Sequence, residues 1–195
     1  MKASFFKRLL AYVIDTIILT LIIGVLSSVV SNKQYEKASE EYMRLQESYM
    51  KQEITITEYQ NDIKPIVYDM QKSSVTINTV SVLLSIAYFI VFQYLNRGQT
   101  IGKKLMRIKI TENNKEPSLK AMVIRTIIIN SILTGILNIV LIYLLNKNTY
   151  YTGYQIVSYI ELAFAFISAL FIIYRKDKLG LHDIIAKTEV IEEAR

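Results

Sequence analysis

Four long apolar stretches dominate this chain and restrict what it can fold into. They are Leu9–Val30, Ser74–Leu95, Thr126–Leu145 and Tyr150–Tyr174. Only the first and the fourth contain a charged residue, Asp15 and Glu161 respectively. A helix of about 20 apolar residues can cross the hydrocarbon core of a bilayer. Because 52% of the residues are hydrophobic and the 21% that are charged lie mostly between these stretches, we predict an all-α integral membrane protein with four transmembrane helices.

Flanking residues set the limits of the predicted spans. We place the spans at 9–30, 74–95, 119–145 and 150–174, within one membrane domain that covers residues 1–195. The third span begins before its apolar stretch because Ser118 is a suitable helix N-cap. We interpret the first span as uncleaved, since it is too long for a secretory signal, contains Asp15 and lacks an A-x-A-like cleavage site.

The distribution of basic residues predicts the orientation of the chain. Lys2, Lys7 and Arg8 precede the first span, whereas Lys147 is the one basic residue in the short link between the third and fourth spans. The segment between the second and third apolar stretches holds Arg97, Lys103, Lys104, Arg107, Lys109, Lys115, Lys120 and Arg125. Basic residues near span ends mark the cytoplasmic side. We therefore predict a membrane protein with both termini in the cytoplasm and residues 34–73 outside.

The net charge of +6 follows from the same asymmetry. A basic cytoplasmic rim is attracted to the anionic lipid headgroups of that leaflet. Membrane insertion thus accounts for the charge, and we expect no nucleic-acid partner.

The outside segment 34–73 is expected to form a helical hairpin. Its first half has an apolar stripe at helical spacing, made by Tyr35, Ala38, Tyr42, Leu45 and Tyr49. In its second half Thr57 is the predicted N-cap, and Pro65 should kink or divide the helix. The hairpin is either a connector that buries its own stripe or a docking surface for a partner outside the cell.

Two short segments alternate between apolar and polar residues as β-strands do. They are residues 105–111, which follow Lys104, and residues 187–191 near the end of the chain. We predict that they pair into a small cytoplasmic β element.

Polar residues recur inside the spans at helical spacing. They are Asp15, Thr16 and Thr20 in the first span, Asn78, Ser81 and Ser85 in the second, Asn130, Thr134 and Asn138 in the third, and Ser158, Glu161 and Ala165 in the fourth. Small and hydrogen-bonding residues line helix contacts in membranes, so these faces should meet. They are either structural contacts or a proton or cation path, which would comprise Asp15, Glu161, Asn78, Asn130, Thr134 and Asn138.

The two intramembrane carboxylates are expected to differ. Asp15 lies about 10 Å, and Glu161 about 20 Å, from the inner end of its span at 1.5 Å per residue. Glu161 has no basic residue at its depth, so we expect it to be protonated and Asp15 to be ionised. We predict that Arg125 pairs with Asp15, while Arg8 is held by lipid phosphate or by Asp183.

Other chemistry finds little support in this sequence. There is no Cys and a single His, so a thiolate or metal site is not expected, and we predict no cofactor. The segment Gly98–Lys103 has the wrong spacing for a phosphate-binding loop. No set of a nucleophile, a general base and a residue that orients the base is apparent. We therefore do not expect an enzyme or catalytic residues.

Three segments together resemble the RDD family of bacterial membrane proteins. They are Lys7–Asp15, with Arg8 and Asp15; Gly98–Leu105, with Gly98, Thr100, Gly102 and Lys103; and Gly180–Thr188, with His182 and Asp183. Their order and spacing fit the family over nearly the whole chain. The long outside segment and the fourth span with Glu161 depart from many members. The resemblance implies a motif network of Arg8, Asp15 and Asp183, to which we add Arg125.

The resemblance implies little about mechanism, because some members have been proposed as cation/proton antiporters and most have no assigned activity. Two functions stay open. One is a proton-coupled cation transporter of the Na⁺/H⁺ kind, or a subunit of one. The other is a non-transporting membrane module for assembly, regulation or envelope sensing. Four spans leave little room for a path inside one monomer, so we expect a homo-oligomer or a membrane partner.

Overall fold

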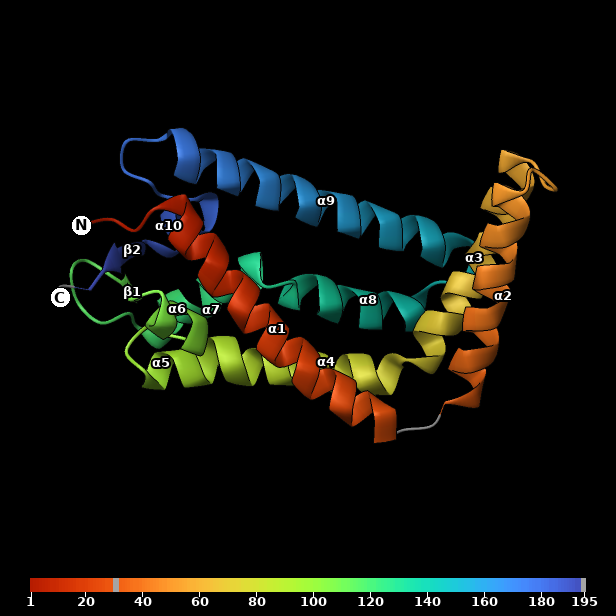
Figure 1. The fold of residues 1–195 in the computed structure, drawn as a ribbon, viewed down its shortest axis with the longest axis horizontal. Coiled ribbons are helices and arrows are strands. Elements are labelled where there is room, and N and C mark those ends of the chain that lie inside the picture. Colours follow the sequence, from red (N-terminus) through yellow and green to blue (C-terminus); the bar gives the residue numbers. More distant parts are fainter. Residues whose placement is uncertain (30–31, 194–195) are drawn as a thin grey trace.

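The computed structural model describes all residues except 30, 31, 194 and 195. In chain order its elements are α1 (Phe5–Val29), α2 (Lys33–Met50), α3 (Ile56–Ser73), α4 (Val75–Ile86), the π-helix η1 (Ala87–Phe92), α5 (Gln93–Leu95), α6 (Ile101–Leu105), β1 (Ile108–Thr111), α7 (Leu119–Ile129), α8 (Ile132–Leu144), α9 (Lys147–Tyr174), α10 (Leu181–Ala186) and β2 (Glu189–Glu192). The helices α4, α8 and α9 lie along roughly one direction, and α1 crosses them obliquely (Figure 1).

Three helices are long and apolar enough to cross a membrane. They are Phe5–Ser28, Val75–Leu95 and Lys147–Tyr174, and the bent pair α7 and α8 becomes a fourth if it is counted as one span. This agrees with the predicted all-α membrane fold. The second span runs through α4, η1 and α5 without a chain break, and its π-helical turn contains Tyr88.

The third span is broken, which the sequence analysis did not predict. α7 and α8 are bent by 64° relative to each other, whereas residues 119–145 were expected to form one helix. The break lies at Asn130 and Ser131, and Ser131 adopts a left-handed backbone conformation with φ 55° and ψ 14°. Such a residue cannot continue the right-handed helix. Ser118 caps the start of α7, as expected, by accepting a hydrogen bond from the Ala121 N–H at 3.2 Å.

The helices α2 and α3 form the hairpin expected for residues 34–73, and they lie across one end of the bundle, here called the hairpin end (Figure 1). The N-cap of α3 is Thr55 rather than the predicted Thr57, because only Thr55 has Glu58 three residues ahead to complete a capping box.

Pro65 does not divide α3. Its fixed φ is compatible with a helix, and the carbonyl that loses its bond belongs to the exposed Asn61.

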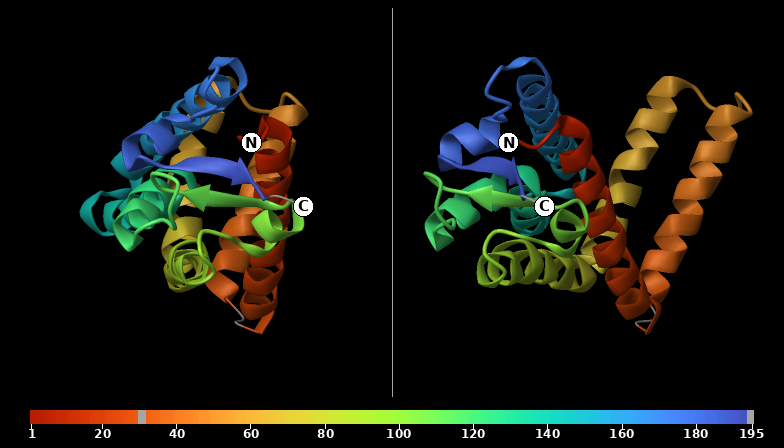
Figure 2. Two further views of the ribbon diagram at one scale, coloured as in Figure 1. Left: turned by 90° about the vertical axis from the view of Figure 1, so that its left-hand side faces the viewer. Right: turned by 60° about the vertical axis from the view of Figure 1, so that its left-hand side comes forward.

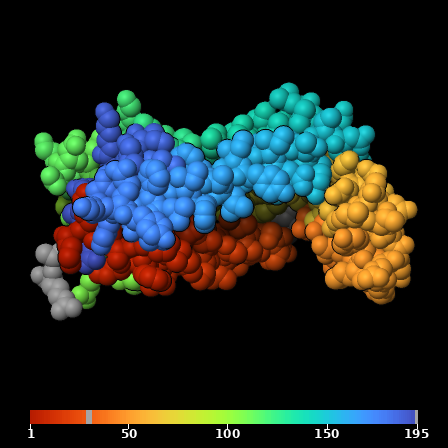
Figure 3. Space-filling view, turned by 90° about the horizontal axis from the view of Figure 1, so that it is seen from above, coloured from red at the N-terminus to blue at the C-terminus, as the bar shows by residue number. Residues whose placement is uncertain are grey.

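Tyrosines join the hairpin to the membrane-spanning bundle. Tyr68 on α3 packs edge-to-face on Tyr150 of α9, with ring centroids 5.6 Å apart. Ile142 of α8 completes this buried cluster. The space-filling view shows the hairpin gathered beyond one end of the bundle (Figure 3).

The predicted β element is present at the opposite end, here called the motif end. β1 and β2 are antiparallel, with Ile108 opposite Glu192 and Thr111 opposite Glu189. The first strand is shorter than the predicted 105–111 because α6 occupies residues up to Leu105 and a turn follows. Figure 2 shows the two strands side by side near the N-terminal residues. The sheet covers a buried apolar cluster of Ala3, Ala11, Ile108, Ile110, Met122 and Val190.

The cap of α3 gives a test of the hairpin. Thr55→Ala removes the hydroxyl that accepts the Glu58 N–H at 3.3 Å, which should cost about 1 kcal/mol of helix stability. Hydrogen exchange of the Glu58 and Tyr59 amides should therefore accelerate roughly fivefold. Thr57→Ala is the matched control and should leave exchange unchanged. Equal acceleration in both variants would contradict the capping box.

Candidate functional site

The carboxylate of Asp15 is fully buried and receives three hydrogen bonds from neutral donors. Tyr88 Oη donates to Oδ1 at 2.6 Å, and the Gly102 N–H donates to the same oxygen at 2.7 Å. Thr100 Oγ1 donates to Oδ2 at 2.5 Å. The Tyr88 hydroxyl also accepts the Ile101 N–H at 3.1 Å. Three elements, α1, η1 and the start of α6, are thus joined at one carboxylate.

Position 102 requires a glycine because the backbone of α6 touches α1 there. A Cβ at Gly102 would lie 2.2 Å from the Ala11 carbonyl oxygen and 2.8 Å from Asp15 Oδ1. Neither atom can move far without breaking the helix or the carboxylate's hydrogen bonds. The Gly98–Lys103 loop is therefore shaped to receive Asp15.

The predicted Asp15–Arg125 pair is wrong. Arg125 Nη1 donates instead to Asp183 Oδ1 and to Thr188 Oγ1, the latter at 3.1 Å. Its place beside Asp15 is taken by Thr100 and Gly102 of the α6 segment. The position of Arg125 along its helix predicted a depth in the membrane near that of Asp15. The rotation of α7 about its axis, however, turns the Arg125 side chain toward α10.

Asp183 instead joins two arginines from distant parts of the chain. Arg8 Nη1 donates to Asp183 Oδ2 at 2.9 Å, which is one of the two partners expected for Arg8. The Gly180 N–H donates to the same oxygen at 3.0 Å. The Asp183 side chain is 0% exposed, and those of Arg8 and Arg125 are 9% and 7% exposed. We call Asp183, Arg8 and Arg125 the arginine–aspartate triad.

His182 lies on α10 beside the triad but does not act as its counter-ion. Its Nδ1 is 2.7 Å from Ser168 Oγ on α9. Ser168 Oγ accepts the Leu181 N–H at 3.1 Å, so its own proton is free to go to Nδ1. Burial, followed by the nearby Arg125 and Arg8, lowers the pKa of His182 well below its ordinary value. The imidazole is therefore neutral and ties α10 to α9.

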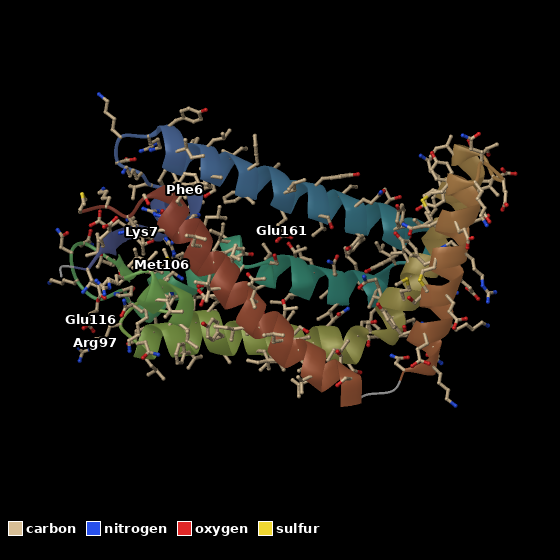
Figure 4. All side chains as sticks on the ribbon, in the orientation of Figure 1. Phe6, Lys7, Arg97, Met106, Glu116 and Glu161 are labelled. Atoms are coloured by element: carbon tan, nitrogen blue, oxygen red, sulfur yellow. The ribbon has the colours of Figure 1, made fainter. Side chains whose placement is uncertain are left out.

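Glu161 is at a different place, near the middle of α9, where it faces the break in the third span. Ser131 Oγ donates to Glu161 Oε1, and Figure 4 shows the Glu161 side chain between α9 and α8. Since Ser131 is the residue with the left-handed backbone, the carboxylate is held at the point where α7 ends and α8 begins.

A cavity of about 280 Å³ adjoins this break between α4, α8 and α9. Its polar lining includes Asn78, Ser81, Ser85, Asn130, Ser131 and Asn138. The buried Oδ1 of Asn138 has no hydrogen-bond partner among the described residues. The polar faces predicted for the second and third spans therefore meet here, apart from Thr134, which does not line the cavity.

The polar face predicted for the first span does not join the others. Thr16 and Thr20 are exposed on α1, and the Thr16 hydroxyl bonds the Tyr12 carbonyl of its own helix at 2.9 Å. Asp15 alone turns inward, toward α6. The predicted path is thus divided: Asp15 belongs to the motif end, whereas Glu161 does not line the cavity itself and contacts it through Ser131.

Sequence reasoning missed several partners. Tyr88, Ser131 and Ser168 lay in apolar spans without a signal for their roles. Thr188 was included in the predicted strand 187–191 and in the family segment, but not as a partner of Arg125. Within the described residues, no group of three or more His, Cys, Asp or Glu side chains could hold a metal ion.

Comparison with known proteins gives one match. A sequence model of the RDD family matches residues 2–187. No curated protein sequence and no solved structure matches the chain.

Loss of the Asp183 charge should be severely destabilising. Asp183→Asn leaves Arg8 and Arg125 buried without a counter-charge, which should cost roughly 3–5 kcal/mol. The expected result is a large drop in Tm of the detergent-solubilised protein. Asp177→Asn is the control, because Asp177 pairs with Arg175 on an exposed loop. Similar Tm values for the two variants would show that the triad does not hold the fold.

The neutral His182 predicts a pH dependence. Because the pKa of His182 is lowered in the folded protein, the unfolded chain alone binds a proton as pH falls through about 6.5. Stability should therefore fall by about 1.4 kcal/mol between pH 7.5 and 5.5, which thermal unfolding can measure. His182→Asn removes the single histidine and should flatten this dependence. An unchanged slope in the variant would assign the effect to other groups.

Proposed function

Because this chain belongs to the RDD family and carries helices that can span a membrane, we propose that it is a proton-coupled transporter of a small monovalent cation, or a subunit of one. It would act in the bacterial plasma membrane with both termini in the cytoplasm. The observation that carries this proposal is Glu161 at the break of the third span.

Broken helices beside a polar cavity are the usual way that transporters build ion sites. At a break the backbone carbonyls and N–H groups are freed from the helix and can bind ions, provided that they line a cavity. Asn130 and Ser131 supply such a break, and the polar cavity adjoins it. A carboxylate within a membrane span is costly unless it has a function or a partner. Glu161 has one hydroxyl partner, Ser131, and no ion pair among the described residues.

The groups around the break are suitable ligands for a hard cation. A carboxylate, amide oxygens and hydroxyl oxygens are the donors that such ions prefer. Asn138 Oδ1 is available, because it is buried without a partner in the described structure. A proton and a cation would compete for Glu161, which is the minimum requirement for exchange of one for the other.

Asp15 and Asp183 are less suited to this exchange. Asp15 receives three hydrogen bonds from Tyr88, Thr100 and Gly102. Asp183 is shared by two arginines. The oxygens of both carboxylates are thus already occupied by donors of the protein and are not free to bind a cation. We therefore assign both residues to holding the motif end together, and we assign ion binding to Glu161, Ser131 and Asn138.

The test is flux in proteoliposomes. An imposed Na⁺ or K⁺ gradient should drive proton movement in the wild type, followed with a pH-sensitive dye. Glu161→Gln should reduce the flux to that of empty vesicles, and Asn138→Leu should weaken it at low cation concentration. Glu40→Gln, which changes an exposed glutamate on the hairpin, is the matched control and should retain full flux.

Two results would refute the proposal. One is full flux in Glu161→Gln, which would remove the proposed carboxylate from the path. The other is no flux from correctly folded wild type with any monovalent cation tried, which would favour the non-transporting module. In that case the exposed hairpin α2–α3 is the surface to use in a search for a partner.

A further inference from the structure

A second cavity, of about 260 Å³, lies at the motif end between α1, α7 and α9. Its walls are mainly apolar and come from α1 and α9, including Phe5, Leu9, Tyr12, Ala165, Ala169 and Ile172. Its inner lining is basic and comprises Arg8, Lys103 and Arg125, with His182 beside them. A pocket with cations at one end and apolar walls matches an amphiphile that has an anionic head.

The basic end of this cavity has more positive than negative charge. Three cations line it, Arg8, Lys103 and Arg125, and two buried carboxylates lie against them, Asp15 and Asp183. The next carboxylate, Glu189, already forms an ion pair with Lys2 at 3.1 Å. His182 is neutral and adds no negative charge. One cation is therefore in excess, and an uncompensated charge in a low-dielectric site is costly.

The donors of these cations are only partly used. Within the described residues, the hydrogen bonds of Arg125 all come from Nη1, so Nε and Nη2 have no protein acceptor. Lys103 Nζ has no carboxylate within 4.0 Å in the same residues, and its partner is the amide oxygen of Gln93 at 2.8 Å, in the orientation that satisfies this amide. Phosphate oxygens are the acceptors that such donors bind best.

The apolar part of the cavity opens toward lipid. Leu9 and Tyr12 on α1 and Ala165 on α9 are exposed, and all three belong to helices that can span the membrane. A soluble anion would gain nothing from these walls, whereas an acyl chain is as apolar as they are and can pack against them within the bilayer. The volume admits a headgroup phosphate and the first part of a chain, and the remainder would stay in the bilayer.

We propose that this cavity is a binding site for one anionic phospholipid of the leaflet at the motif end. The phosphate is bound by Lys103 and Arg125, and one acyl chain lies between α1 and α9. The site is independent of the proposed ion exchange, because its excess positive charge disfavours a cation there. Among its lining residues, it shares Asn130 with the cavity beside the break of the third span.

Native mass spectrometry of the full-length protein in detergent tests the site. Three probes are compared: phosphatidylglycerol, phosphatidylcholine with the same acyl chains, and inorganic phosphate. The wild type should retain one molecule of phosphatidylglycerol and neither of the other two. Lys103→Gln should weaken phosphatidylglycerol binding about tenfold, since a charge-assisted hydrogen bond contributes enough for that loss. Ala165→Phe should block the apolar wall and have a similar effect.

Each variant has a matched control on the same helix. Lys104→Gln changes an exposed neighbour that does not line the cavity, and Ala163→Phe adds the same bulk to an exposed position of α9 away from it. Both should bind phosphatidylglycerol like the wild type. Equal retention of the two lipids, displacement of phosphatidylglycerol by inorganic phosphate, or unchanged binding in both Lys103→Gln and Ala165→Phe would overturn the proposal.

Discussion

The carboxylate of Asp183 lies between the guanidinium groups of Arg8 and Arg125, and the motif end of the protein depends on this arrangement. The three residues come from the beginning, the middle and the end of the chain, on α1, α7 and α10. Removing Asp183 would leave both arginines buried without a counter-charge. Removing either arginine would leave one Asp183 oxygen without its guanidinium donor. Electrostatics in a low-dielectric region thus fixes where three distant segments meet.

Asp15 is also a buried carboxylate, but its hydrogen-bond donors are neutral groups. Its charge is stabilised by two hydroxyls and a backbone N–H instead of a cation. That solution requires the backbone of α6 to approach α1 closely, which only glycine at position 102 allows. The triad and the Asp15 cluster together make the motif end a closely bonded unit. By contrast, Glu161 has one hydroxyl partner beside a polar cavity, so the two parts of the molecule have different physical characters.

Much of the fold could be predicted because it follows from local pattern. The apolar stretches predicted the spans, and the alternation of apolar and polar residues predicted the paired strands. Ser118 was recognisable as a helix N-cap. The predictions failed where no local sequence pattern indicates the structure. Nothing at Asn130–Ser131 resembles a helix breaker such as proline, so the 64° bend was missed. The N-cap of α3 was misplaced by two residues because Thr55 and Thr57 are both acceptable caps until Glu58 is considered.

The sequence predicted which residues belong to the candidate site, but not which of them pair with one another. Arg8, Asp15, Arg125 and Asp183 were all named from sequence, and Arg8 was given Asp183 as one possible partner. Arg125 was paired with the wrong carboxylate, because sequence gives the depth of a residue along a helix but not the rotation of that helix about its axis. A rotation of α7 decides between Asp15 and Asp183 at nearly the same depth.

The sequence by itself determined that this chain has helices apolar enough to span a membrane, and which charges must find partners there. These properties depend on hydrophobic length and on the cost of burying charge, which are set by neighbours along the chain. Only the tertiary structure decided which partner each charge has, that the third span is broken beside Glu161, and that an apolar pocket ends at basic side chains. Those outcomes depend on contacts between segments far apart in the sequence, so no local pattern encodes them.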